Sequence, residues 1–254
     1  MRRRALLIAP AALSWGLAGA AERTLRVAVA ANLRSVFPAL AKHWRAGGGP
    51  ALTVSYGASG IFTRQLERGA PFDLFLSADS GFAERLAGRG LTRGPPRVYA
   101  LGRCALLVHP RAGFSGTEPA ARVLADVAGR TGERFSIANP EHAPYGRAAR
   151  DILVRHGLGA DGDAHRLNAE NAAQATRWVA GGHALAGIVP ASLAIAASAD
   201  GAARHWLLPA DWHRPLPQAL VVMRSAAPAA DALADWLTGP DAAAILAAAG
   251  YGVP

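Results

Sequence analysis

The stretch VSYGASGIFTRQLERGAPFDLFLSAD, residues 54–79, is the most informative about the fold, because a strand pattern runs into a glycine-flanked serine and then into a helix pattern. Gly57 and Gly60 relax the backbone on either side of Ser59. Such a turn directs the unpaired N–H groups and the positive end of the helix dipole toward whatever lies beside the serine. Ser59 is therefore either part of an anion site or the N-cap of its helix, and this stretch alone favours the cap.

The same strand-then-helix unit occurs on both sides of this stretch. Residues 25–31, LRVAVAA, predict a fully buried strand that ends at Asn32, where a helical pattern begins. Residues 74–79, LFLSAD, lead into a third helix. Strands that alternate with helices at this spacing predict a mostly parallel sheet. Ligands of such sheets bind beyond the carboxyl ends of the strands, which is where Asn32 and Ser59 fall.

The order of elements starts again in the second half of the chain, after residues 97–110, RVYALGRCALLVHP, which we interpret as one long strand. Helices are predicted at 119–128, 145–156, 172–180, 230–237 and 240–249, and strands at 135–139, 184–189 and 218–223. This order predicts a second sheet, with the strands at 97–110 and 218–223 crossing between two lobes. We expect one lobe at residues 22–100 plus 216–254 and the other at residues 101–215.

The N-terminal segment and the charge of the chain indicate an exported protein. Residues 1–21 combine arginines, an apolar stretch and small residues, as secretory signals do, and we expect the protein in the periplasm. No later stretch is long and apolar enough to predict a membrane span. The formal net charge of +9 becomes +6 without the three arginines of the signal, and the other arginines are scattered. Nucleic-acid binding is therefore not expected. Cys104, the only cysteine, is expected in the core.

Catalysis has little support in the sequence. The nucleophile elbow Gly-x-Ser-x-Gly is not completed at Ser59, because Gly60 comes one place too early. The eight histidines are spread singly, and we expect His205 and His213 at the surface rather than on a metal ion. No Walker loop or dinucleotide fingerprint is present. We expect a protein that is not an enzyme and has no cofactor, with a periplasmic serine hydrolase using Ser59 as a weaker alternative.

Two segments of the second lobe place helix starts beside polar groups. NPEHAPYGRAARDIL, residues 139–153, opens a helix at Tyr145 after two prolines. In AENAAQATRW, residues 169–178, Asn171 is placed to cap a helix whose first N–H groups include that of Ala173. Taken alone, these residues are a packed tyrosine and a simple cap. Together with the two helix starts of the first lobe, they predict four helix N-termini that converge on an anion between the lobes.

The segments AANL, YGASGIF, GAPFDLFLSAD, ANPEHAPYG, ENAAQA, GIVPAS and the terminal LTGPDAAAILAAAGYGVP resemble the periplasmic molybdate-binding proteins of ATP-driven oxyanion importers. The resemblance covers the chain after the signal in order. It implies an α/β, two-lobed type II periplasmic binding fold, in which a mostly parallel sheet flanked by helices forms each lobe and two crossover strands join them. It also implies molybdate or tungstate as the ligand, an inner-membrane ABC permease as the partner, and a monomer.

The resemblance implies particular ligand-binding residues. In the family, one lobe contributes a polar residue after the first strand and the serine of the glycine-rich turn, which fall here on Asn32 and Ser59. The other lobe contributes groups that fall here on Tyr145 and on the backbone of Ala173. No residue is expected to bind a metal cation directly, since molybdenum would be present only as molybdate.

The chain departs from the family pattern at two positions. Some members carry a hydroxyl residue where this chain has Ala31, which can offer only its backbone N–H. Others carry a tyrosine where this chain has Pro190, and proline has no donor. Members with the PYG form carry their tyrosine at the position of Tyr145, which is therefore expected to take over this role.

The implied pocket consists of neutral donors, namely the hydroxyls of Ser59 and Tyr145, the amide of Asn32, and N–H groups near Ala31, Gly60 and Ala173. Hydrogen bonds to a charged acceptor contribute about 1.5–3 kcal/mol each, so no arginine is required. A site with many donors and few acceptors disfavours phosphate, whose proton would lack an acceptor. Sulfate has no such proton. A carrier of sulfate, of another oxyanion or of an iron complex therefore stays an alternative.

Overall fold

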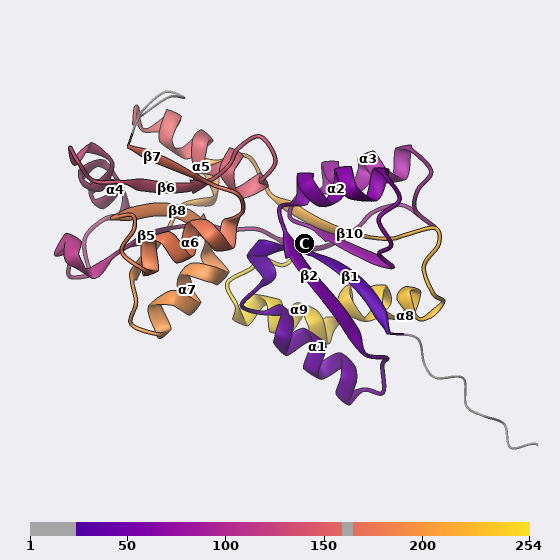
Figure 1. Ribbon diagram of the computed structural model, residues 1–254. Coiled ribbons are helices and arrows are strands. Elements are labelled where there is room, and N and C mark those ends of the chain that lie inside the picture. Colours follow the sequence, from indigo (N-terminus) through magenta and orange to yellow (C-terminus); the bar gives the residue numbers. More distant parts are fainter. Residues whose placement is uncertain (1–23, 159–164) are drawn as a thin grey trace, which may run out of the picture.

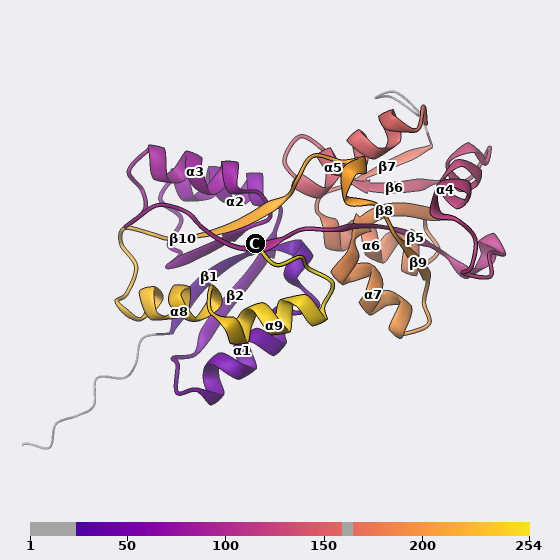
Figure 2. The ribbon, with the colours of Figure 1, turned by 180° about the vertical axis from the view of Figure 1, so that it is seen from behind.

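The structure, a computed structural model, describes residues 24–158 and 165–254, so the expected signal at residues 1–21 lies outside the described residues. Two five-stranded sheets stand side by side, and helices cover the faces of each sheet (Figures 1 and 2). The sheets form two lobes, which we call the first and the second in chain order. This layered arrangement allows each sheet to bury both of its faces.

The first lobe contains strands β1 (Leu25–Ala30), β2 (Leu52–Gly57), β3 (Leu74–Ser77), β4 (Arg97–Leu101) and β10 (Pro217–Val222). Its helices are η1 (Ala31–Leu33), α1 (Phe37–Ala46), α2 (Ser59–Glu67), α3 (Ser80–Gly88), α8 (Ala229–Leu237) and α9 (Pro240–Ala248). The strand order is β2-β1-β3-β10-β4. β1 pairs in parallel with β2 and β3, whereas β10 runs antiparallel to β3 and β4. Helices α2 and α3 lie on one face, and α1, α8 and α9 lie on the other (Figure 1).

The second lobe contains strands β5 (Cys104–Val108), β6 (Phe135–Ala138), β7 (Arg166–Ala169), β8 (Ala186–Pro190) and β9 (Arg204–Leu207). Its helices are η2 (Pro110–Ala112), α4 (Ala120–Gly129), α5 (Pro144–Arg155), α6 (Ala172–Ala180), α7 (Ala191–Ala199) and η3 (Ala210–Trp212). The strand order is β7-β6-β8-β5-β9. β6 pairs in parallel with β7 and β8, whereas β5 runs antiparallel to β8 and β9.

Continuous apolar runs form the central strands of both sheets. β1, LRVAVA, and β5, CALLV, are buried at nearly every position, as strands covered by helices on both sides must be. Cys104 is buried, as expected. The predicted α/β fold with two helix-flanked sheets is confirmed. The antiparallel strands β10 and β5 are each the first strand formed after the chain crosses between the sheets.

Several predictions about individual elements were wrong. Residues 97–110 form two strands, β4 and β5, because the chain crosses from one sheet to the other at Gly102. Asn32 lies within the short 3-10 helix η1, and the longer helix α1 begins only at Phe37. The sequence pattern does not predict β7, α7 or β9. Two of these are four-residue strands, and α7 is apolar almost throughout, so none has a clear period.

The two crossovers and the C-terminus meet beside the junction of the lobes. The chain crosses at residues 102–103 and returns between β9 and β10. After α9 the chain comes back to the end of β4, where the backbone groups of Leu101 and Gly252 exchange hydrogen bonds of 2.9 and 2.8 Å (Figure 2). Side chains from all three segments can therefore reach the space between the lobes.

Candidate functional site

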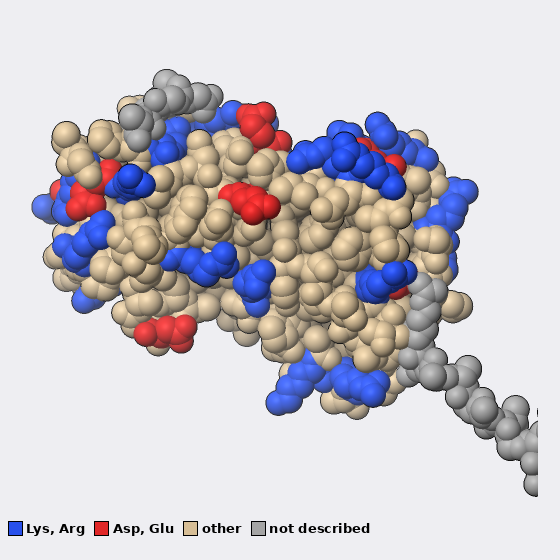
Figure 3. All heavy atoms as spheres, in the orientation of Figure 1, with Lys and Arg blue, Asp and Glu red and all other residues tan. Residues whose placement is uncertain are grey.

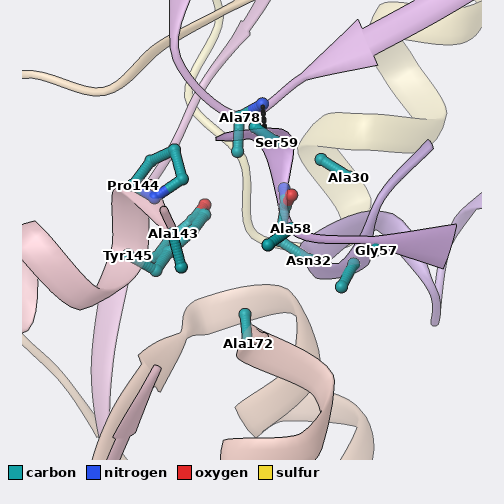
Figure 4. A pocket seen from close by; sticks show the side chains of 11 residues that line it. Ala30, Asn32, Gly57, Ala58, Ser59, Ala78, Ala143, Pro144, Tyr145 and Ala172 are labelled. Atoms are coloured by element: carbon teal, nitrogen blue, oxygen red, sulfur yellow. Dashed lines mark hydrogen bonds between the residues drawn. The ribbon is translucent and has the colours of Figure 1, made fainter. Parts of the chain in front are cut away.

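A small cavity of about 200 Å³ lies between the lobes (Figure 4). The first lobe lines it at the carboxyl ends of β1, β2 and β3, and the second lobe lines it at the starts of α5 and α6. Its lining residues are Ala30, Ala31, Asn32, Gly57, Ala58, Ser59, Ala78, Ala143, Pro144, Tyr145 and Ala172. No charged side chain belongs to this lining, so any polarity in the cavity comes from hydroxyl, amide and backbone groups.

Ser59 is the first residue of α2 and is 1% exposed. The N-cap is Ala58, and no side chain caps this helix, so the interpretation of Ser59 as a cap was wrong. Its Oγ instead accepts a hydrogen bond of 3.0 Å from the Ala78 N–H (Figure 4). Since the oxygen already accepts, the hydroxyl hydrogen is left for another acceptor. Among the described residues, neither a histidine nor a carboxylate contacts this oxygen, as a serine nucleophile would require.

Tyr145 comes from the other side of the cavity, in the first turn of α5 directly after Pro144. The ring is buried, and Oη accepts a hydrogen bond of 2.9 Å from Gln218 Nε2. Burial raises the pKa of this hydroxyl well above its ordinary value. Tyr145 is therefore a neutral residue that retains its proton, and that proton has no acceptor among the described residues.

Asn32 lines the cavity, but its side-chain N–H groups are directed into the protein. Nδ2 donates to Gln218 Oε1 and to Tyr251 Oη, both at 2.9 Å, so the expected amide donor is already committed. Its Oδ1 is buried without a hydrogen-bond partner among the described residues. The donor that Asn32 retains is its backbone N–H at the start of η1, beside that of Ala31, and neither has an acceptor within the described part of the chain.

The start of α6 supplies further backbone donors. Asn171 caps this helix as predicted, because its Oδ1 accepts from the Gln174 N–H at 3.0 Å. The N–H groups of Ala172 and Ala173 have no acceptor among the described residues. Ala172 lines the cavity, and Ala173 is the next, buried residue. Pro190, where a tyrosine is found in other members of the family that the chain resembles, ends β8 outside the lining.

The Gly60 N–H is not available to a ligand. It donates to the His142 carbonyl oxygen at 3.0 Å, across the junction of the lobes, so the expectation of an anion donor near Gly60 was wrong. A Cβ atom at this position would lie 2.9 Å from the same oxygen. Gly60 is therefore a point of close approach between the lobes rather than a donor to the cavity.

Other contacts also join the lobes around the cavity. Ser192 Oγ of α7 lies 2.9 Å from the Asn32 carbonyl oxygen and 3.1 Å from Tyr251 Oη. Arg147 of α5 forms an ion pair with Asp79, the N-cap of α3. The lobes are thus closed over the cavity, with contacts on more than one of its sides.

Charged residues lie outside the cavity in a second hollow of about 410 Å³, which shares Pro144 with it. Arg147 faces this hollow, as does Arg214, which pairs with Asp151 at 2.9 Å. On the face shown in Figure 3, Lys and Arg side chains are spread over both lobes in separate groups. The basic charge therefore surrounds a neutral ligand cavity without entering it.

The described residues contain no group of three or more His, Cys, Asp or Glu side chains that would hold a metal ion. His205 is half-buried against Ser198 Oγ, and His213 is buried, which corrects the expectation of two surface histidines. None of the helices in residues 24–158 and 165–254 is long and apolar enough to cross a membrane.

Sequence reasoning missed the buried polar residues behind the cavity, which are Tyr99, Ser192, Gln218 and Tyr251. The sequence contained one indication of these buried residues. Gln218 opens the apolar run QALVVM, and a glutamine at the start of a buried strand needs hydrogen-bond partners for both ends of its amide. Tyr251 and Tyr99 gave no comparable signal, because a tyrosine in a core is common.

Two lobes that enclose a small cavity, with helix starts directed into it from both sides, are the arrangement of a solute-binding protein of the periplasmic binding fold. The sequence pattern of the bacterial extracellular solute-binding protein family matches residues 25–252, and the chain belongs to this family.

Individual relatives span almost the same length. The chain is 34% identical over 247 residues to the molybdate-binding protein ModA of Azotobacter vinelandii, covering 95% of this chain and 96% of the relative. It is 30% identical over 244 residues to ModA of Rhodobacter capsulatus, with coverage of 94% and 93%. The solved structure of the periplasmic molybdate-binding protein of A. vinelandii superposes with a TM-score of 0.81 at 32% identity, over 91% of this chain and 99% of that one.

Proposed function

We propose that this protein captures molybdate or tungstate in the periplasm and delivers the oxyanion to an ABC permease of the inner membrane. The observation that carries the proposal is a cavity between the lobes whose lining has no charged side chain but includes the hydroxyl residues Ser59 and Tyr145 and the helix starts of both lobes. Relatives that match nearly the whole chain are named as molybdate-binding proteins. The proposal includes no catalytic step and no cofactor.

The ligand would be held by neutral donors. The Ser59 and Tyr145 hydroxyls each accept a hydrogen bond from the protein, which leaves their protons for the anion. The N–H groups that open η1 and α6, including those of Ala31, Asn32 and Ala173, are the backbone donors. Each hydrogen bond to a charged oxygen contributes about 1.5–3 kcal/mol, so several such bonds can offset the desolvation of a doubly charged anion.

The enclosure of the cavity also suits a small oxyanion. Both lobes contribute residues to its lining, so a bound ion would be held from two sides. Opening of the lobes would release the ion, and the closed arrangement would present one continuous surface to the permease.

A thermal-melt panel tests the proposed ligand. Purified protein without its signal is melted with molybdate, tungstate, sulfate, phosphate or ferric citrate. A ligand at about one hundred times its dissociation constant stabilises the folded state by roughly 2.7 kcal/mol. We expect large upward shifts with molybdate and tungstate and little or none with phosphate. A shift with sulfate alone would assign a sulfate carrier, and no shift with either molybdate or tungstate would overturn the proposal.

A further inference from the structure

Gln218 lies directly behind the cavity and is fully buried on β10. Both ends of its amide are engaged. Nε2 donates to Tyr145 Oη at 2.9 Å, and Oε1 accepts from Asn32 Nδ2 at 2.9 Å and lies 3.0 Å from Tyr99 Oη. Gln218 does not line the cavity itself, so its effect on a ligand must act through the residues that it contacts.

The surrounding donors fix which way the Gln218 amide points. In the structure Asn32 Nδ2 faces Gln218 and can only donate, and with this arrangement the Gln218 atom that faces it is the oxygen. Nε2 then faces Tyr145, and Oη becomes the acceptor of that hydrogen bond. Since the Tyr145 oxygen accepts a hydrogen bond from Gln218 on the side away from the cavity, its own hydrogen is left to point toward the cavity. The buried hydrogen bonds of Gln218 thus orient the Tyr145 hydroxyl hydrogen toward the cavity.

Gly102 makes the room in which this contact forms. A Cβ atom at Gly102 would lie 2.6 Å from Tyr145 Oη and 2.8 Å from Gln218 Nε2. The backbone of Gly102 is not in the left-handed region, so its conformation does not itself require glycine. What the position requires is the absence of a side chain. Gly102 lies on the crossover between β4 and β5, and Gln218 lies on the strand that returns, so both crossovers meet at Tyr145.

We propose that Gln218 and Gly102 are positioning residues that orient Tyr145 as a hydrogen-bond donor toward the cavity, and so favour fully deprotonated oxyanions over protonated ones. This inference rests on the proposed function. A free tyrosine hydroxyl can either donate to an anion or accept from one, and the second mode would suit hydrogen phosphate. Because the oxygen already accepts from Gln218, the contact favours the donating mode toward the anion.

A double-mutant cycle with Tyr145→Phe tests the proposal. Gln218→Met keeps the length of the side chain but removes its donor, and Gly102→Ala fills the space of the contact without removing either partner. Gly129→Ala is the matched control, because its added Cβ would meet nothing within 4 Å. Dissociation constants for molybdate and tungstate are measured by calorimetry, and ligand-free melts check that each variant folds.

We expect Gln218→Met and Gly102→Ala each to weaken binding by about tenfold with Tyr145 present, and by less than about threefold in the Tyr145→Phe background. Gly129→Ala should leave the affinity unchanged. A merely structural role would instead give the same loss in both backgrounds, and that result would overturn the inference. If Gln218→Met does not fold, the double-mutant cycle of Gly102→Ala with Tyr145→Phe tests the inference by itself.

Phosphate competition provides a second readout. The ratio of phosphate affinity to molybdate affinity should rise in Gly102→Ala, because the released Tyr145 hydroxyl can accept a hydrogen bond from the O–H group of hydrogen phosphate. An unchanged ratio would argue against the specificity role. If the unmodified protein binds no oxyanion, the proposed function fails and the inference fails with it. If the unmodified protein binds molybdate but the cycles are additive, only the inference fails.

Discussion

The two lobes are built alike but contribute differently to the cavity. Each sheet joins three strands in parallel and then adds two antiparallel pairings. In the first lobe, Ser59 is held by the Ala78 N–H and Asn32 by Gln218 and Tyr251. In the second lobe, the one polar side chain in the lining is Tyr145, and its partner Gln218 belongs to the sheet of the first lobe. The first lobe is therefore a preformed half-site, whereas the second is completed by closure.

Glycines show the same difference between the lobes. Gly146 in α5 packs against the backbone of its own lobe, where an added Cβ atom would lie 2.2 Å from the Ala138 carbonyl oxygen. Gly60 in α2 meets the opposite lobe, 2.9 Å from the His142 oxygen. One glycine lets a helix approach its sheet, and the other lets the lobes approach each other. A methyl group at each site should therefore damage a different property, the fold in one case and closure in the other.

The largest effect is expected for Gly146→Ala. The new methyl group would overlap backbone atoms that cannot rotate away, so the second lobe must shift, and we expect a loss of about 3 kcal/mol in the free energy of unfolding. Urea denaturation without ligand measures it. Gly129→Ala, in the same lobe with open space around its Cβ, should change stability by no more than about 0.5 kcal/mol. Equal stability of the two variants would contradict the packing of α5 on β6.

The next effects are expected for the two hydroxyls on opposite sides of the cavity. Ser59→Ala and Tyr145→Phe should each weaken molybdate binding by about 1–3 kcal/mol, because each removes one donor to a buried anion. Because both hydroxyls donate to the same anion, the loss in the double variant should differ from the sum of the single losses. Calorimetry measures both values. Affinity that is retained in both single variants would remove these residues from the site.

Much of the fold was predictable because its signals are local. Buried strands such as β1 and β5 are continuous apolar runs, and the helix boundaries at Asn171 and at Pro240 follow from cap and proline chemistry. The break at Gly102 was not predictable, since Arg97 to Val108 reads as one apolar strand. Only the arrangement of two sheets in space shows that the chain must leave one sheet and enter the other there.

The residues that line the cavity were predictable in their positions, and the atoms that they offer to it were less so. Asn32, Ser59 and Tyr145 all line the cavity, as the ends of strands and the starts of helices indicated. The atom that each residue presents to the cavity depends on hydrogen-bond partners that are far away in the sequence. Asn32 turns its amide toward Gln218, 186 residues later, and the Gly60 N–H is taken by His142 in the opposite lobe. No local pattern contains that information.

Gly60→Ala should act on closure without affecting the fold. Its methyl group would meet the His142 oxygen only when the lobes are closed, so ligand-free stability should be nearly unchanged while molybdate affinity falls by about tenfold, or roughly 1.4 kcal/mol. Melts without ligand and calorimetry with molybdate separate the two effects. Gly88→Ala in the neighbouring α3 has open space and is the control. A loss of stability equal to the loss of affinity would show that Gly60 serves the fold of its own lobe.

The smallest effect is expected at the ion pair between Arg147 and Asp79, which joins the lobes at the edge of the second hollow. Both side chains are partly exposed, and exposed pairs contribute at most about 1 kcal/mol. Arg147→Gln should therefore weaken molybdate binding by less than about 1 kcal/mol, and the difference from the unmodified protein should shrink as salt is added.

Comparing Arg214→Gln with Arg147→Gln distinguishes two roles of Arg147: holding the lobes together through its ion pair, or attracting anions by its charge alone. Arg214 faces the same hollow and also pairs with a carboxylate, but its partner Asp151 lies on α5 of the second lobe and makes no bridge to the first. Both variants remove one positive charge from the second hollow. Both should therefore slow the association of the anion equally if the arginines only steer it. If the Arg147–Asp79 ion pair holds the lobes together, Arg147→Gln alone should speed the dissociation of molybdate, since only that pair must break when the lobes separate. Stopped-flow rates at two salt concentrations distinguish these outcomes, and equal dissociation rates in the two variants would leave closure to the buried contacts of Tyr145, Gly60 and Ser192.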